Sequence, residues 1–218
     1  MTTALISLMH VLVFVYWLGG DLGAFYTSRM ISDSARPAAA RIVAAQALSA
    51  LDMAPRTALI LTLPTGATLA TVTGHVTLPV AALVATWVLS LGWLWLAWRI
   101  HLKHLPPSAG VRRLDLGIRW VVLSGLVVTG VGIVTGVVGA PLFLGLKVLI
   151  LGAAIATGLW VRQLIAPSGA AFAALVTAGP SDEGNQIIAR ALVRARPAVM
   201  LIWLLLLSAA FLGLWRPQ

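Results

Sequence analysis

The sequence predicts an all-helical membrane bundle: a single transmembrane domain over residues 1–218 with about six spans. Hydrophobic residues make up 60% of the chain and charged residues only 10%, whereas about a quarter of the residues in soluble domains are charged. Several apolar runs also reach the roughly 20 residues that an α-helix needs to cross a bilayer. A membrane β-barrel would show short alternating segments instead, so the pattern favours helices.

The spans are expected at residues 4–27, 54–74, 79–101, 117–138, 142–165 and 197–215. The second is expected to continue a helix that begins near Pro37, with Ser34 as its N-cap. Before the last span, Ser181 followed by two acids is typical of a helix start. The basic segment after Ser181 is expected to form a helix that lies on the membrane surface, with docking of a partner as the alternative.

Arginine and lysine gather in alternate loops. The loops after the first, third and fifth predicted spans are basic, whereas "GHVTLP" and "GAP" contain neither residue. The positive-inside rule therefore places the basic loops in the cytoplasm and both termini outside. The net charge of +9 is accounted for by these loops, so nucleic acid is not an expected partner. The expected location is the bilayer of a bacterial inner (plasma) membrane. Most of the tryptophans near the cytoplasmic helix ends are expected to be interfacial; they are Trp93, Trp95, Trp98, Trp120 and Trp160.

Ionisable residues inside spans usually face the bundle interior and mark function. His10, Trp17 and Asp21 fall on one face of the first span, so Trp17 is a candidate cofactor contact beside His10. At 1.5 Å per residue, His10 lies roughly 9 Å below the outer end of its span, and Lys147 lies at about the same level of the fifth. Asp21 lies much deeper, at the level of Arg56. The sequence therefore predicts two polar layers.

The outer layer has several explanations. A metal or haem iron held by His10 and Lys147 would account for both residues, and so would a proton relay. Two structural explanations stay open: His10 hydrogen-bonded to a neighbouring helix, and Lys147 snorkelling to the interface. His75, in the loop "GHVTLP", is the reserve ligand. Cysteine is absent, which excludes thiolate ligands and cysteine nucleophiles.

In the inner layer, Asp21 and Arg56 are predicted to form an ion pair, with Asp52 and Arg119 as further members. Both residues of the pair are candidates for acid–base catalysis, Asp21 by carrying protons between the cytoplasm and the site.

Four segments resemble a known family. "HVLVFVYWLGGDLGAFY" is similar to the start of the HemJ-type protoporphyrinogen oxidases and the related CopD-like membrane proteins, where a histidine precedes a tryptophan, small residues and an aromatic pair. "RTALILTLPTGATLATVTG" resembles the family's proline-containing helix, "FLGLKVLILGAAIATGLWVRQL" its lysine helix, and "RARPAVMLIWLLLLSAAFLGLWRP" its last helix. The resemblance implies a haem b bound by His10, with Lys147 as the second axial ligand. The chain departs from the family at "RARP", where an acidic residue is usual before the proline.

The favoured hypothesis is a membrane b-type haem protein that transfers electrons between quinone and another donor or acceptor. A tetrapyrrole dehydrogenase is its sharper form. A transporter for copper or another small solute, and a structural subunit of a larger membrane complex, are the alternatives; a homo-oligomer also stays open. Against transport, the methionines form no clustered soft-ligand ladder, and the two halves show no convincing inverted repeat.

Overall fold

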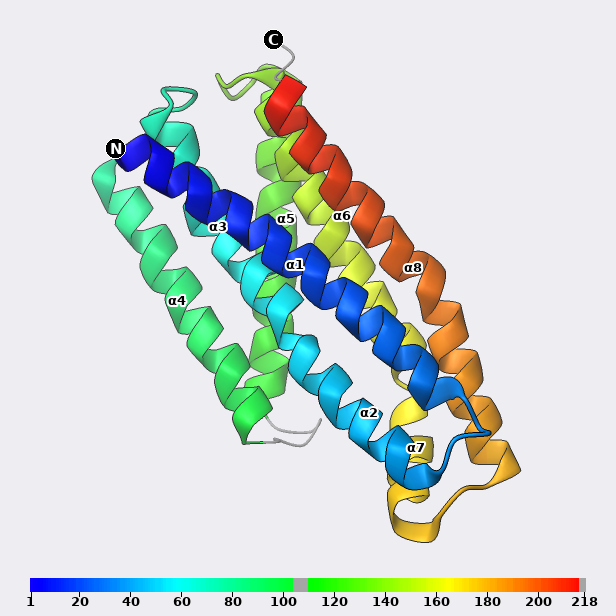
Figure 1. Ribbon diagram of the computed structural model, residues 1–218. Coiled ribbons are helices and arrows are strands. Elements are labelled where there is room, and N and C mark those ends of the chain that lie inside the picture. Colours follow the sequence, from blue (N-terminus) through cyan, green and yellow to red (C-terminus); the bar gives the residue numbers. More distant parts are fainter. Residues whose placement is uncertain (104–109, 216–218) are drawn as a thin grey trace.

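A computed structural model describes residues 1–103 and 110–215, and these form a bundle of long helices (Figure 1). The helices are α1 (Thr2–Ser32), α2 (Ala38–Leu51), α3 (Met53–Val72), α4 (Val80–Leu102), α5 (Gly110–Val134), α6 (Leu142–Ile165), α7 (Ser168–Ala178) and α8 (Asp182–Trp215). The all-helical membrane bundle that the sequence predicts is therefore confirmed. The chain is an integral membrane protein.

Within the described residues, five helices are long and apolar enough to cross a bilayer: α1, α4, α5, α6 and α8. The second predicted span corresponds to α3, which is 20 residues long but not apolar enough to join these five. Arg56, Pro64 and several threonines lower its hydropathy. In the folded chain α3 packs between α1 and α4 (Figure 1), so neighbouring helices cover much of its surface.

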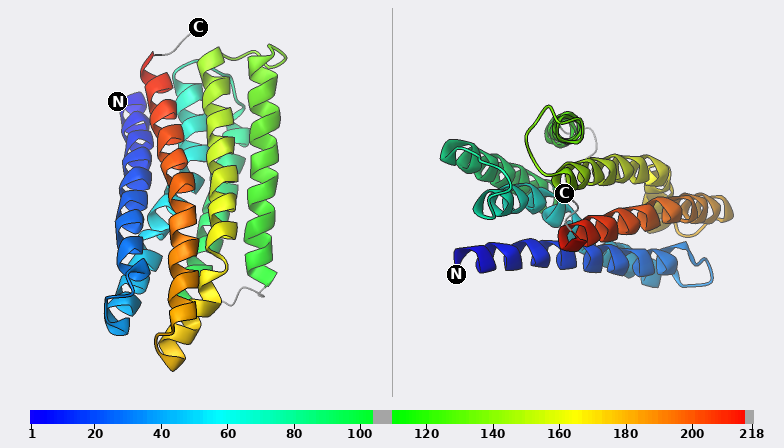
Figure 2. Two further views of the ribbon diagram at one scale, coloured as in Figure 1. Left: turned by 90° about the vertical axis from the view of Figure 1, so that its right-hand side faces the viewer. Right: turned by 90° about the horizontal axis from the view of Figure 1, so that it is seen from above.

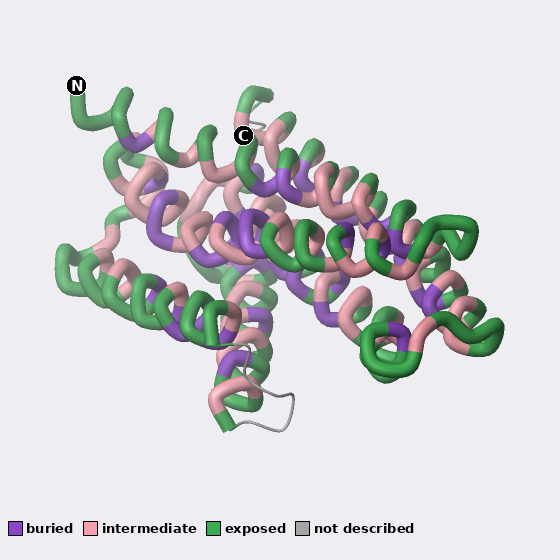
Figure 3. The backbone as a smooth tube through the Cα atoms, turned by 60° about the horizontal axis from the view of Figure 1, so that its bottom comes forward, coloured by how far each residue is buried: buried purple, intermediate pink, exposed green. Residues whose placement is uncertain are grey.

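The N-terminus and the end of α8 lie together at one end of the bundle, which we call the terminal end (Figure 1). The connections that follow α1 and α6, and the end of α4, lie at the other, which we call the arginine-rich end. Successive loops therefore lie at opposite ends of the bundle, as the alternation of basic and uncharged loops predicts. Large hydrophobic side chains are exposed along α1, α4, α5 and α8, whereas buried residues line the middle of the bundle (Figure 3). The exposed apolar surface suits contact with lipid chains.

Helices α1 and α8 are longer than a membrane requires. With 31 and 34 residues they extend over about 46 Å and 51 Å, against a hydrocarbon core of about 30 Å. Their surplus length packs with α2 and α7 into a lobe that projects at the arginine-rich end (Figure 2). The lobe has its own apolar core around Ile31, Ala44, Leu175 and Ile188.

A buried arginine ties this lobe together. Arg41 of α2 is 1% exposed. Its Nε donates to the carbonyl oxygen of Ile31 over 2.9 Å, and its Nη1 donates to Asn185 Oδ1 over 2.6 Å. One guanidinium therefore joins α1, α2 and α8. Because a buried charge is costly unless it is hydrogen-bonded, these two bonds are what allow Arg41 to lie inside the lobe.

Three local predictions have different outcomes. The helix start at Ser181 is confirmed: its Oγ accepts the Gly184 N–H over 3.1 Å. The surface helix predicted after it is wrong, since this segment is the first half of a continuous α8 that passes through Pro197 into the span. Ser34 does not cap α2, whose N-cap is Pro37 without a side-chain bond. The predicted helix from Pro37 is present, but it is divided at Asp52 into α2 and α3.

Close contact between α1 and α3 depends on one glycine. A Cβ atom on Gly20 would lie 2.5 Å from Ala54 Cβ and 2.8 Å from Pro55 Cδ. Real Cβ atoms do not approach so closely, so only glycine lets the two backbones meet here. Small residues at helix crossings serve this purpose in membrane bundles. The contact fixes α1 against the start of α3, beside Asp21.

Candidate functional site

His10 is held by a hydrogen bond to the neighbouring helix α3. Its Nδ1 lies 2.9 Å from Thr65 Oγ1. Thr65 is 1% exposed and its hydroxyl also donates to the carbonyl oxygen of Leu61 over 2.6 Å. Gly66 follows Thr65, and a Cβ there would lie 3.4 Å from His10 Cε1. The imidazole therefore lies against a stretch of α3 that contributes one hydroxyl group, from Thr65, and has no side chain at Gly66.

This network assigns the proton on the His10 ring. A threonine hydroxyl has one hydrogen, and that of Thr65 is used on the Leu61 carbonyl. Towards His10 the same oxygen can only accept, so Nδ1 carries the proton and donates. The lone pair of the neutral ring is then on Nε2, for which the described part of the chain provides no hydrogen bond. Anchoring of one ring nitrogen leaves the other as a potential metal ligand.

Lys147 of α6 lies close enough for its charge to act on the His10 ring. Its ammonium group also faces α8, where a Cβ on Gly213 would come within 2.9 Å of Lys147 Nζ. The structure therefore brings α1, α3, α6 and α8 together around these two basic side chains. We call His10, Thr65 and Lys147 the terminal-end site.

His75, the reserve ligand, lies just beyond α3. Its Nδ1 is 2.6 Å from Thr73 Oγ1, and its ring stands edge-on to Phe143, with 5.1 Å between centroids. Phe143 lies one turn before Lys147 on α6. His75 therefore belongs to the terminal end of the bundle, but its ring is already engaged by a hydroxyl and an aromatic neighbour.

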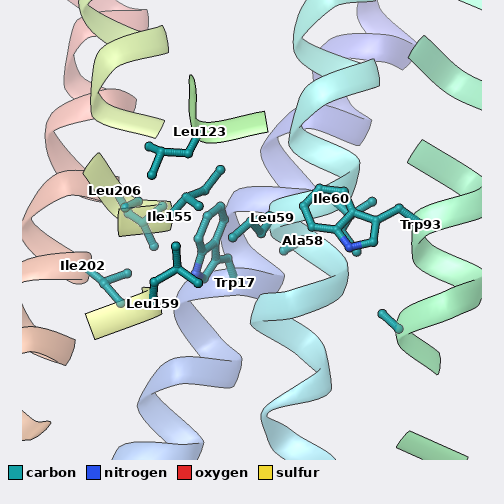
Figure 4. Packing of buried hydrophobic residues seen from close by; sticks show 12 residues of the cluster. Trp17, Ala58, Leu59, Ile60, Trp93, Leu123, Ile155, Leu159, Ile202 and Leu206 are labelled. Atoms are coloured by element: carbon teal, nitrogen blue, oxygen red, sulfur yellow. The ribbon is translucent and has the colours of Figure 1, made fainter. Parts of the chain in front are cut away.

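The largest apolar cluster of the bundle lies on the deeper side of the terminal-end site. Trp17 is 4% exposed and belongs to this cluster. In Figure 4 its indole ring lies among Ile155 and Leu159 of α6 and Leu59 of α3. Trp17 is two turns from His10 along α1 and one turn before Asp21. Packed side chains therefore stand between the two predicted polar layers, and Trp17 serves this packing.

The predicted ion pair between Asp21 and Arg56 is wrong. Arg56 pairs with Asp52, one turn before it, and Arg119 pairs with Asp115 of its own helix. Asp21 receives the indole N–H of Trp17 on its own helix, while its Oδ2 is buried with no hydrogen-bond partner in the described chain. The local pairings prevail because residues four apart on a helix are neighbours already.

A second polar network was not predicted. Asp115 of α5 is 5% exposed, accepts the Trp93 indole N–H over 2.9 Å and the Arg119 Nε–H over 3.0 Å. Arg162 of α6 approaches the same carboxylate to 3.7 Å. Trp93 is therefore a buried hydrogen-bond donor, and not one of the interfacial tryptophans that make up most of its predicted group. The available signal was an acid four residues before an arginine, in "RRLDLGIRW".

Two adjoining hollows open beside this network at the arginine-rich end. The smaller, about 10 Å³, is lined by Arg56, Arg112, Asp115, Arg119, Arg162 and two apolar residues of α4. The larger, about 200 Å³, is lined by Ser49, Asp52, Arg56, Ile100, His101 and Arg112. Both share Arg56 and Arg112. The sequence predicts Arg56 and Arg119 in one polar layer, but it places Arg112 and Arg162 in cytoplasmic loops and does not predict that all four converge.

Comparisons with known proteins do not name a family. No family model, no curated protein and no solved structure matches the chain. The resemblance to the HemJ-type and CopD-like proteins thus stays a prediction. Within residues 1–103 and 110–215, no three or more His, Cys, Asp or Glu side chains are grouped to hold a metal ion.

Proposed function

We propose that this protein is a membrane b-type haem protein that transfers electrons, with His10 as an axial ligand. The observation that supports the proposal is the bond between His10 Nδ1 and Thr65. It fixes the ring and presents the lone pair of Nε2, as the second hydrogen bond of a metal-bound histidine does. A haem iron takes four ligands from the porphyrin and needs one or two from the chain. A single well-held histidine therefore suffices.

Two glycines shape the surroundings of His10 and Lys147. Gly66 and Gly213 allow the imidazole ring and the ammonium group to lie close against α3 and α8. Lys147 and His75 both lie at the terminal end and are the candidates for the second axial position. Lys147 is preferred because it lies close enough to the His10 ring for its charge to act on it.

When bound, the haem would supply one-electron chemistry, with quinone or a tetrapyrrole as the exchange partner. The chain itself would hold the haem through His10 and exclude water from the site. Thr65 orients the His10 ring, and the apolar cluster around Trp17 keeps water from the deeper side of the site. Asp21, with an unpaired buried Oδ2, is the group that takes up and releases a proton. Arg56 is not proposed to form an ion pair with Asp21, because it already pairs with Asp52.

The apolar cluster is also the reason why electron transfer is preferred over transport. Ala58, Ile60 and Ile155 are almost completely buried in the cluster that contains Trp17 (Figure 4), and Trp17 lies between His10 and Asp21 along α1. A solute path would need polar groups through this region. Electrons need none, since they pass between cofactors without displacing side chains.

The test is the absorption spectrum of the detergent-purified protein, oxidised and dithionite-reduced, with a pyridine haemochrome assay. We expect a Soret band and a sharp reduced α band in the parent, and loss of both in His10→Ala. His101→Ala is the matched control, because it removes a histidine at the opposite end. Lys147→Met and His75→Ala then decide the second ligand. A folded His10→Ala protein with full haem content, or a parent that stays colourless after haem is supplied, would overturn the proposal.

A further inference from the structure

Buried polar side-chain atoms without a hydrogen-bond partner gather where α1 and α8 meet. Within residues 1–103 and 110–215 these atoms are Asp21 Oδ2, Arg41 Nη2, Arg196 Nε and Trp203 Nε1. Asp21 lies on α1, whereas Arg196 and Trp203 lie on α8. Arg41 is hydrogen-bonded to both helices. The two helices run side by side (Figure 2), and we call the surface between them the α1–α8 contact.

The four atoms follow one another from Arg41, in the lobe at the arginine-rich end, to Asp21 in the middle of the bundle. Arg196 and Trp203 are seven residues apart, so they share a face of α8 and lie about 10 Å apart along its axis. That face meets α1, because the Trp203 ring packs edge-on against Phe25 with 5.0 Å between ring centroids. Asp21 lies one turn before Phe25 on α1. The row therefore leads from the lobe along the contact to Asp21.

The row consists of three hydrogen-bond donors and one acceptor. Guanidinium and indole nitrogens can only donate, whereas the oxygen of an ionised carboxylate accepts. Buried polar groups in proteins are almost always hydrogen-bonded, and ordered water is the partner where no protein group is. A water molecule that accepts a bond from one of these nitrogens keeps its own two hydrogens for its neighbours. Water along the contact would therefore direct hydrogens towards Asp21, the acceptor at the end of the row.

We propose that the α1–α8 contact holds a row of ordered water molecules that delivers protons from the arginine-rich end to Asp21. The inference rests on the proposed function, in which Asp21 takes up and releases a proton. In each step one O–H bond forms and a neighbouring O–H bond breaks, so that a proton from water at the lobe ends on Asp21 Oδ2. Arginine keeps its own proton throughout, so Arg41 and Arg196 only position the water. The row ends at Asp21, because Trp17 and the apolar cluster lie beyond it.

The experiment uses the full-length protein in detergent and follows the protonation of Asp21 after a rapid drop in pH. The readout is the infrared band of the carboxylic acid C=O group, assigned to Asp21 by its loss in Asp21→Asn. Trp203→Phe removes the indole donor but keeps an aromatic ring against Phe25. Arg196→Met removes the guanidinium donor and keeps an unbranched side chain. Trp203→Phe keeps the test valid if Arg196→Met fails to fold.

Two control variants lie on α4, outside the contact. They are Trp87→Phe, whose indole donates to Thr68, and Arg99→Met, whose guanidinium lies over the Trp95 ring. A second readout is hydrogen–deuterium exchange of the indole N–H groups, measured by NMR on protein with labelled tryptophan. Trp93 is the reference, because it is buried and its N–H is bonded to Asp115. Neither readout depends on haem, so failure of the haem proposal leaves the test intact.

We expect protonation of Asp21 to be about tenfold slower in Trp203→Phe and in Arg196→Met, because each variant removes one hydrogen bond to the water. Both control variants should match the parent. The Trp203 N–H should exchange with deuterium faster than the Trp93 N–H, since water contacts the first and a carboxylate holds the second.

Unchanged protonation rates in both contact variants, or a Trp203 N–H as well protected as that of Trp93, would refute the proposal. Slowing in Asp52→Asn alone would refute it too. Asp52 lines the larger hollow and acts electrostatically on Asp21, so protons would then enter from that side. If no pH produces the Asp21 band, the proton role of Asp21 in the proposed function is wrong as well.

Discussion

The Nδ1 atom of His10 and the hydroxyl oxygen of Thr65 lie 2.9 Å apart across the contact between α1 and α3. The bond joins a residue ten positions from the N-terminus to a helix that begins at Met53. It gives the ring one orientation and one tautomer, because the Thr65 hydroxyl is already committed to Leu61. The behaviour of His10 therefore depends on Thr65.

Thr65→Val should loosen the terminal-end site without removing His10. Valine keeps the shape but loses the acceptor, so the ring N–H is left without its partner. Changes next to a metal-bound histidine typically cost 10–100-fold in affinity, and we expect a loss of that order in a haem titration followed at the Soret band. Thr62→Val is the control, since the Thr62 hydroxyl donates to the Ala58 carbonyl of its own helix. Equal titration curves for the two variants would contradict this assignment.

Asp21→Asn should stabilise the protein. The Asp21 Oδ2 atom is buried and has no partner among the described residues, and an unpaired buried carboxylate opposes folding. A neutral amide of the same shape removes that cost, so we expect a higher melting temperature in detergent together with lower activity if Asp21 handles protons. A lower melting temperature would mean that the carboxylate has a stabilising partner after all.

Asp115→Asn should destabilise strongly. The carboxylate is buried and shared by Arg119 and Arg162, and removing one member of a buried ionic group typically costs about 3–5 kcal/mol. Asp33→Asn is the control. Its pair with Arg36 is 45% exposed on both sides, so its loss should cost about 1 kcal/mol or less. Melting temperatures of the two variants, measured side by side, check the difference; similar values would show that Asp115 is not a structural centre.

Gly20→Ala should disrupt the contact between α1 and α3, because the added Cβ would overlap Ala54 and Pro55. Gly19→Ala is the control at the next position, where nothing lies within 4 Å of an added Cβ. In a helix interior alanine is favoured over glycine by about 1 kcal/mol, so Gly19→Ala should be neutral or stabilising. The yield of monodisperse protein after detergent extraction separates the two outcomes. Poor yield of both variants would point to a general intolerance of α1 instead.

Much of the architecture follows from the sequence because hydropathy and loop charge determine spans and their alternation. The same reasoning set His10 and Lys147 at one level, and the structure brings them together. The predicted ion pair between Asp21 and Arg56 was wrong, because the depth of a residue along a helix does not determine which way its side chain points around the helix axis. Rotation directs Arg56 to Asp52, its neighbour one turn away.

The convergence of Arg112 and Arg162 on Arg56 and Arg119 was missed for a related reason. These arginines come from α3, α5 and α6, and only the packing of the three helices reveals that they line one hollow. The last span was predicted to begin at Pro197, but the helix α8 continues through this proline. Neighbouring helices of a membrane bundle can accommodate a proline inside a long helix. Sequence patterns therefore located the elements better than they located the contacts between them.

The modest hydropathy of α3 has a consequence for biosynthesis. A segment with Arg56 near its start and several threonines gains little from entering lipid alone, on the scale that describes insertion by the translocon. In the finished protein, α1 and α4 enclose it. We therefore expect α3 to enter the bilayer as a hairpin with the strongly apolar α4, which is made after it. Until α4 has left the ribosome, we therefore expect His10 to lie in the membrane without its hydrogen bond to Thr65.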